Sequence, residues 1–168
     1  MLDVLILGYG NTLRGDDALG IHVAHALHDF YCTDGHVRVL ATSQLTFDLA
    51  EDISQANMIL FIDAAVRGIP GEIHSEEVRP SEEKVRFSHH WTPQNLLMLC
   101  SQLYGKMPSA FALTMAIASS EVRVGLSQEI EHRMPELLER AKAIVSGWRL
   151  ASATKPRALT DQAQLMQH

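Results

Sequence analysis

Cysteine is scarce in this sequence, and long apolar runs are absent from it. The two cysteines, Cys32 and Cys100, are too few for a disulfide framework, so we expect reduced thiols and a cytoplasmic location. No apolar run approaches the roughly 20 residues that a membrane-spanning helix needs. The opening residues carry an acid at position 3 and no basic region, which leads us to expect no secretory signal peptide.

Positive charge is also in short supply. The chain of 168 residues has 14 lysines and arginines against 20 aspartates and glutamates, a net charge of −6. Nucleic-acid surfaces and polybasic membrane patches need the opposite balance, so we expect neither nucleic acid nor a membrane as a partner. The apolar content of 46% is that of a globular chain with one core. Because the pattern contains no exposed apolar stripe, we expect a monomer.

Apolar runs alternate along the chain with amphipathic segments. The apolar runs predict strands at 3–10, 36–41, 57–65 and 109–118, with a weaker edge strand at 72–79. One predicted helix begins at Asp17, and the others span 45–54, 92–105 and 127–150. This order predicts an α/β fold: a single doubly wound domain over residues 1–150, with a mostly parallel sheet of about five strands and helices on both faces. Residues 151–168 predict a flexible C-terminal tail.

The stretch LGYGNTLRGDDALG (residues 7–20) combines the glycines of a phosphate-binding turn with two adjacent carboxylates. Gly8 and Gly10 fit the dinucleotide pattern G-x-G-x-x-G/A, whereas Leu13 stands at its third position. Asp16 and Asp17 would repel a pyrophosphate at the helix N-terminus. A nucleotide-binding module is therefore the weaker interpretation, and a test for NAD or ATP binding decides it. A helix N-terminus explains one of the two acids, and we assign Asp16 to the N-cap.

Asp17 and Asp63 are expected to meet at one edge of the sheet. Asp63 ends the strongest strand run, and the functional crevice of a doubly wound sheet lies beyond the carboxyl ends of the strands. The loop FSHHWTP (87–93) carries His89 and His90, which can reach the same crevice. Two carboxylates and an imidazole suit a divalent transition metal such as nickel or zinc, and they leave coordination positions open for water or substrate.

Nothing in the sequence marks a covalent nucleophile. Cys100 is expected in the core, and no G-x-S-x-G elbow is present. His22, His25 and His28 recur every three residues, but they fall on the side of a helix away from its apolar stripe and are expected to be solvated. Water is therefore the expected attacking group in any hydrolysis at this crevice.

Three blocks of the sequence together resemble the maturation endopeptidases of nickel-iron hydrogenases. The blocks are VLILGYGNTLRGDDALG, FIDAAVRGIPGEI and SHHWTPQNLL, and their order and spacing match the family over roughly residues 1–150. A G-N-x-L-x-x-D-D block followed by an I-D-A…P-G block is specific, although neither half is specific alone.

The resemblance implies a function and a site. Members of this family cleave a short C-terminal extension from the precursor of the hydrogenase large subunit after nickel insertion, which makes that precursor the expected partner. The resemblance also implies metal binding by Asp17, Asp63 and His89, with His90 as the alternative third ligand. The expected metal is nickel carried by the substrate, with zinc or cadmium as divalent substitutes in vitro.

Two mechanisms stay open at this point. In the first, the metal lowers the pKa of a bound water and polarises the peptide carbonyl. In the second, Asp17 or Asp63 acts as a general base, and the metal serves only for recognition. A non-catalytic checkpoint protein that binds nickel or the precursor would have the same sequence signature, so only a cleavage assay separates it from an endopeptidase.

Overall fold

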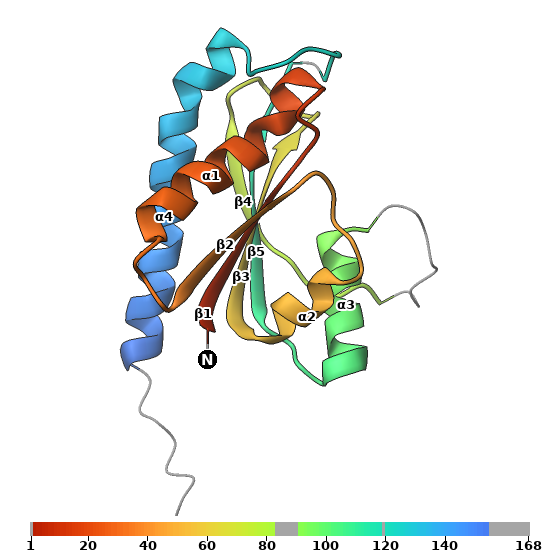
Figure 1. Ribbon diagram of the computed structural model, residues 1–168, viewed down its shortest axis with the longest axis vertical. Coiled ribbons are helices and arrows are strands. Elements are labelled where there is room, and N and C mark those ends of the chain that lie inside the picture. The colour runs from red at the N-terminus through yellow and green to blue at the C-terminus, as the bar shows by residue number, and fades with distance from the viewer. Residues whose placement is uncertain (1, 83–90, 119, 155–168) are drawn as a thin grey trace, which may run out of the picture.

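The computed structural model describes residues 2–82, 91–118 and 120–154 and shows a sheet between two layers of helices (Figure 1). The strands are β1 (Leu2–Tyr9), β2 (Val37–Thr42), β3 (Ala56–Ala65), β4 (Ile73–Glu77) and β5 (Ser109–Ala116). The helices are α1 (Leu19–Tyr31), α2 (Leu49–Ser54), α3 (Pro93–Tyr104) and α4 (Gln128–Thr154), and a 3₁₀ turn (Gly15–Ala18) precedes α1. The predicted order of elements is confirmed.

The five-stranded sheet has the order β2-β1-β3-β5-β4. Neighbouring strands are parallel except β4, which pairs antiparallel with β5 at the edge. The prediction of a doubly wound, mostly parallel α/β fold is therefore confirmed, and the strand order switches between β1 and β3. In that pair Gly8 lies opposite Ile62, which brings Tyr9 and Asp63 level at the carboxyl ends of the two strands.

Side chains of the central strands alternate between two apolar cores. Val4 and Ile6 of β1 belong to the core beneath α1 and α4, while Leu5 and Leu7 belong to the core beneath α2 and α3. Figure 1 shows these two pairs of helices on opposite sides of the sheet. Because both faces are covered, a central strand is apolar at nearly every position. This explains why β3 is continuously apolar from Met58 to Ile62, directly before Asp63.

The ends of α3 follow from local signals that the sequence displays. Thr92 Oγ1 accepts the backbone N–H of Asn95 at 3.2 Å, and Pro93 takes the first helical position. Gly105 ends the helix in the left-handed region, with φ of 62°. The capped start of α3 fixes the chain directly after Trp91, which lines the candidate site described below.

Three helix ends differ from the prediction. α1 begins at Leu19 rather than Asp17, because the intervening residues form the 3₁₀ turn. α2 begins at Leu49 rather than residue 45, because Leu45 is buried in the core beneath α2 and α3 and the helical turns start only after it. α4 continues to Thr154, past the predicted domain end at residue 150. The rest of the predicted tail, 155–168, lies outside the described residues.

No helix in the described ranges has both the length and the apolar character needed to cross a bilayer. The longest, α4, carries charged side chains along most of its length, including Glu129, Arg133 and Lys142.

Candidate functional site

Glycines let the 3₁₀ turn and the start of α1 lie directly against the ends of β1 and β3. A Cβ on Gly10 would lie 1.8 Å from the carbonyl oxygen of Asp17, and one on Gly20 would lie 2.4 Å from that of Ile62. A Cβ on Gly8 would lie 2.1 Å from the carbonyl oxygen of Gly20. Such distances exclude any side chain. The glycine pattern is thus explained by backbone packing within the fold, and it needs no bound phosphate.

This packing brings Asp17 and Asp63 together. Both line a hollow of about 190 Å³ at the carboxyl end of the sheet, which we call the Asp17–Asp63 hollow. Its wall comes from the end of β1 and the loop that follows it, from the loop after β2, from Asp63 near the end of β3, and from the residue before the cap of α3. The other lining residues are Tyr9, Gly10, Ser43, Gln44, Leu45 and Trp91.

Asp17 is held by the loop that precedes it. Its Oδ2 accepts the backbone N–H of Asn11 at 3.0 Å, and the side-chain oxygen of Asn11 accepts the N–H of Leu13 at 2.9 Å. No residue in the described ranges makes a hydrogen bond to the other carboxylate oxygen of Asp17, Oδ1. Among the described residues, Asp17 is therefore fixed through one oxygen, and its second oxygen has no hydrogen-bond partner.

Asp63 is a carboxylate in an unfavourable environment. Its pKa is raised to about 6, chiefly by burial and to a smaller extent by the nearby charge of Asp17, while the N–H of Ala64 and the hydroxyl of Tyr9 act in the opposite direction. The Ala64 N–H donates to Asp63 Oδ1 at 2.8 Å. Burial, together with the charge of Asp63, also raises the pKa of Tyr9. A proton or a cation in the hollow would relieve the repulsion between the two carboxylates.

Asp16 does not cap α1, contrary to the prediction. The residue before α1 is Ala18, which has no capping side chain, and Asp16 is buried with 4% of its surface exposed. Its Oδ1 accepts the backbone N–H of Ser127, and the guanidinium of Arg123 lies 3.5 Å away. Asp16 therefore ties the loop after β1 to the start of α4.

The sequence contains a signal for this contact. Ser127 caps α4, since its Oγ accepts the N–H of Ile130 at 3.3 Å. A capping box would place Glu or Gln where Ile130 stands, to bond back to the N–H of the capping serine. Because Ile130 cannot do this, the N–H of Ser127 needs an acceptor from elsewhere in the fold, and Asp16 supplies it.

The two candidate histidine ligands cannot be placed. His89 and His90 lie outside the described residues, so the choice between them stays open. Trp91, which follows them directly in the sequence, lines the Asp17–Asp63 hollow. Within the ranges that the structure describes, no three histidine, cysteine or acidic side chains gather as a metal-binding group.

The expectations for the three histidines of α1 and for Cys100 are confirmed. His22, His25 and His28 are exposed on α1, and Cys100 is buried in the core beneath α2 and α3. Sequence reasoning missed the contribution of the loop after β2, which brings Ser43 and Gln44 to the hollow. The signal lies in the strand order, because β2 is the other neighbour of β1.

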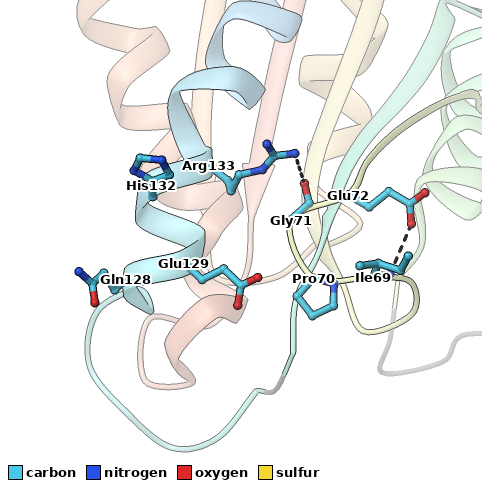
Figure 2. Close-up of a pocket in the computed structure, with 8 residues that line it drawn as sticks. All are labelled: Ile69, Pro70, Gly71, Glu72, Gln128, Glu129, His132 and Arg133. Atoms are coloured by element: carbon cyan, nitrogen blue, oxygen red, sulfur yellow. Dashed lines mark hydrogen bonds between the residues drawn. The ribbon is translucent and has the colours of Figure 1, made fainter.

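A second hollow, of about 690 Å³, lies between the turn after β3 and the first turns of α4. Figure 2 shows the side chain of Arg133 reaching across to the turn, where it donates to the carbonyl of Gly71 at 3.1 Å. Glu72 accepts the N–H of Ile69 at 3.4 Å within the same turn. These polar groups hold the turn against the helix. The smaller Asp17–Asp63 hollow is the better candidate, because only there do two predicted site carboxylates meet.

Known proteins resemble this chain in sequence and in fold. A family model described as hydrogenase maturation protease (HycI) matches residues 21–144. The chain belongs to this family. The Hydrogenase 2 maturation protease of Escherichia coli (strain K12) is 26% identical over 147 residues, covering 83% of this chain and 88% of that protein.

Two solved structures of the family have the same fold. The hydrogenase maturating endopeptidase HybD from E. coli superposes with a TM-score of 0.69 at 21% identity, over 87% of this chain and 93% of that one. The [NiFe] hydrogenase maturation protease HycI from Thermococcus kodakarensis KOD1 gives a TM-score of 0.70 at 21% identity, over 86% and 92% of the two chains. The resemblance drawn from the sequence blocks is confirmed, and the chain is assigned to a family of peptidases.

The buried charge of Asp63 should destabilise the protease at neutral pH. Its pKa is about 6 in the folded chain and about 3.9 in an unfolded one, so folding favours the protonated form. This contribution to stability is present below pH 4 and is lost as the pH rises through 6. We expect Asp63→Asn to raise the free energy of unfolding at pH 7 by about 1–2 kcal/mol.

Urea unfolding of both proteins from pH 4 to pH 7.5 measures this difference. The gap between Asp63→Asn and wild type should shrink toward pH 4. A variant that is less stable than wild type at pH 7 would contradict the analysis.

The contact between Asp16 and Ser127 should contribute more to the free energy of unfolding than the capping hydrogen bond of the Ser127 side chain. Asp16→Ala leaves the part-buried N–H of Ser127 without its acceptor, and we expect a loss of about 2–3 kcal/mol in the free energy of unfolding. Ser127→Ala keeps that N–H and removes only the cap, which costs about 1 kcal/mol. Urea unfolding at pH 7 compares the two variants, and an equal or smaller loss in Asp16→Ala would refute the role assigned to Asp16.

Proposed function

We propose that this protein is an endopeptidase that removes the C-terminal extension of a nickel-iron hydrogenase large-subunit precursor after nickel insertion. The observation that carries the proposal is that two carboxylates, Asp17 and Asp63, line one hollow at the carboxyl end of the sheet. The chain that holds them belongs to the maturation protease family. The relatives named as maturation proteases support the reaction class.

We propose that the Asp17–Asp63 hollow takes the metal that the precursor already carries. The free Oδ1 of Asp17 and the carboxylate of Asp63 offer oxygen ligands, and His89, or alternatively His90, supplies a nitrogen. An oxygen and nitrogen donor set suits nickel, and also zinc or cadmium in vitro. The raised pKa of Asp63 supports this assignment, because a divalent cation would hold both carboxylates in the charged form.

Hydrolysis in this site uses water. Ser43 lines the hollow, but no histidine or lysine in the described ranges forms a hydrogen bond with it, so an activated serine is not supported. Asp63, whose pKa of about 6 leaves it largely ionised at neutral pH, can accept a proton from water. When bound, the metal would polarise the scissile carbonyl. We assign proton acceptance from water to Asp63 and the fixed metal-binding position to Asp17.

Two further expectations accompany this proposal. Asp17 next to a buried Asp16 disfavours phosphate, and the glycines have a packing role, so a nucleotide-binding module gains no support. We propose that the protease works in the cytoplasm, where the exposed thiol of Cys32 stays reduced, and that it is a monomer that meets the precursor transiently.

Replacing the site carboxylates should abolish processing. We expect Asp17→Asn and Asp63→Asn each to slow cleavage by about 100-fold or more, because each removes a metal ligand or the base. Asp48→Asn, an exposed aspartate at the start of α2 without a capping bond, is the matched control and should be unaffected. Intact-mass spectrometry of the nickel-loaded precursor, with apo-precursor alongside, measures loss of the C-terminal peptide.

The outcomes of this assay separate the possible functions. Cleavage of the loaded precursor alone supports metal recognition, whereas cleavage of both forms keeps the protease and discards metal recognition. An intact precursor that still binds wild type identifies the checkpoint protein. Single His89→Ala and His90→Ala variants decide the third ligand, and full activity in both would remove the histidine from the site.

A further inference from the structure

Tyr9 ends β1, and its side chain lines the Asp17–Asp63 hollow. Leu7, two positions earlier in the strand, points into the core beneath α2 and α3, so the side chain of Tyr9 lies on the same face of the sheet. Its ring packs against that core, as does the ring of Trp91, which also lines the hollow. This packing restricts the ring of Tyr9 and therefore the place of its hydroxyl in the wall of the hollow.

Asp63 lies beside Tyr9 on the neighbouring strand. The register pairs Gly8 with Ile62 in two parallel strands, so the residues that follow them, Tyr9 and Asp63, are level. Phe61, two positions before Asp63, belongs to the core beneath α2 and α3, which puts Asp63 on the face that Tyr9 occupies. Adjacent strands lie about 4.8 Å apart, so the two side chains are within reach of each other. The hydroxyl of Tyr9 donates a hydrogen bond to the carboxylate of Asp63.

The residue on the other side of Tyr9 is engaged elsewhere. Thr42 of β2 pairs with Tyr9 in the register of the sheet, and its hydroxyl donates to the carbonyl of Gln44 at 2.9 Å. Thr42 thus holds the turn after β2. Asp63 is therefore the polar partner that the sheet brings to the hydroxyl of Tyr9.

Hydrogen bonds decide how each carboxylate of the hollow is turned, because the terminal torsion of an aspartate has only broad preferences of its own. Asp17 is held by the N–H of Asn11. Asp63 is held by the N–H of Ala64 at 2.8 Å and by the hydroxyl of Tyr9. A carboxylate has about four lone-pair positions, so these two donors still leave room for a ligand. Among the described residues, only the N–H of Ala64 would hold Asp63 if the hydroxyl were removed.

We propose that Tyr9 is a positioning residue, whose hydroxyl holds the Asp63 carboxylate so that one of its oxygens faces the hollow. The oxygen that faces the hollow is then in place for the metal of the precursor and for the attacking water. This inference rests on the proposed function, because it prepares Asp63 for a ligand. Hydrogen bonds from neighbouring groups to a metal-binding carboxylate fix its orientation and increase the affinity for the metal.

Calorimetric titration with Cd²⁺ at pH 7.5 tests this role without turnover. Tyr9→Phe keeps the packed ring and removes only the hydroxyl, and we expect it to weaken Cd²⁺ binding by about ten-fold. Tyr104→Phe removes the same group from the last residue of α3, where the tyrosine is 43% exposed, and is the matched control with unchanged affinity. Equal affinity in wild type and Tyr9→Phe would overturn the proposal.

Cleavage kinetics give a second measurement. We expect kcat for the nickel-loaded precursor to fall by about ten-fold in Tyr9→Phe, because a carboxylate that is turned away from the reacting atoms is a poor base and a poor ligand. Tyr104→Phe should cut at the rate of wild type. Intact-mass time courses at saturating precursor measure kcat, and an unchanged value in Tyr9→Phe would contradict the role of its hydroxyl.

Urea unfolding at pH 7 shows whether Tyr9 acts through Asp63. A hydrogen bond to a charged carboxylate contributes more than one to a neutral amide. We therefore expect Tyr9→Phe to lower the free energy of unfolding by more in the wild-type chain than in Asp63→Asn, where the charge is gone. A loss of equal size in the two backgrounds, together with unchanged Cd²⁺ affinity, would reduce Tyr9 to a structural residue.

The two proposals fail in different ways. If wild type and Tyr9→Phe bind Cd²⁺ and cut the precursor equally well, the role of Tyr9 is refuted and the peptidase is kept. If Tyr9→Phe binds Cd²⁺ more weakly but wild type never cuts the precursor, the peptidase is refuted and the positioning role is kept. A wild type that neither binds Cd²⁺ nor cuts the precursor refutes both.

Discussion

The contact on which the site depends is a backbone contact: the 3₁₀ turn and the first turn of α1 lie directly on the ends of β1 and β3. Gly8, Gly10 and Gly20 make this possible, because a Cβ at any of them would overlap a carbonyl oxygen. A fold that binds phosphate uses the same close approach to bring peptide N–H groups to an anion. Here the close backbone packing places Asp17 near Asp63, and two neighbouring carboxylates would favour a bound cation.

Two loops at this end of the sheet, the one after β1 and the one before α4, are tied together by hydrogen bonds. Asn11 positions Asp17, and Asp16 reaches the start of α4 through Ser127. The bridge between Arg14 and Arg123 adds a second link between the same two loops. A buried carboxylate and an isolated β-bridge therefore hold the loops beside the candidate site in place, while Asp63 carries an unfavourable charge that the proposed function would use. A loss of folding stability at a functional site is expected where activity and stability compete.

Much of this could be predicted from the sequence because the signals were local. Apolar runs marked the strands, Thr92, Pro93 and Gly105 marked the ends of α3, and Asp63 stood out as the acid that follows a buried apolar run. The role of Asp16 could not be read in the same way, because its partner is the backbone of Ser127, far away in the chain.

The sequence analysis also missed where α1 begins and that the loop after β2 lines the hollow. The reason is related. Both depend on how elements pack: α1 is displaced by the 3₁₀ turn, and Ser43 and Gln44 reach the hollow because β2 lies next to β1. No local pattern encodes these contacts. The third ligand, His89 or His90, stays a prediction from the sequence blocks.

The most direct test of the account is calorimetric titration of the protease with Cd²⁺, as a stand-in for nickel, at pH 5 and at pH 7.5. The account predicts one site per chain and tighter binding at pH 7.5, because Asp63, with its pKa of about 6, must lose its proton to bind. Asp17→Asn should weaken binding by about ten-fold or more. Equal affinity in wild type and Asp17→Asn, or no binding in wild type, would contradict the claim that these two carboxylates form a cation site.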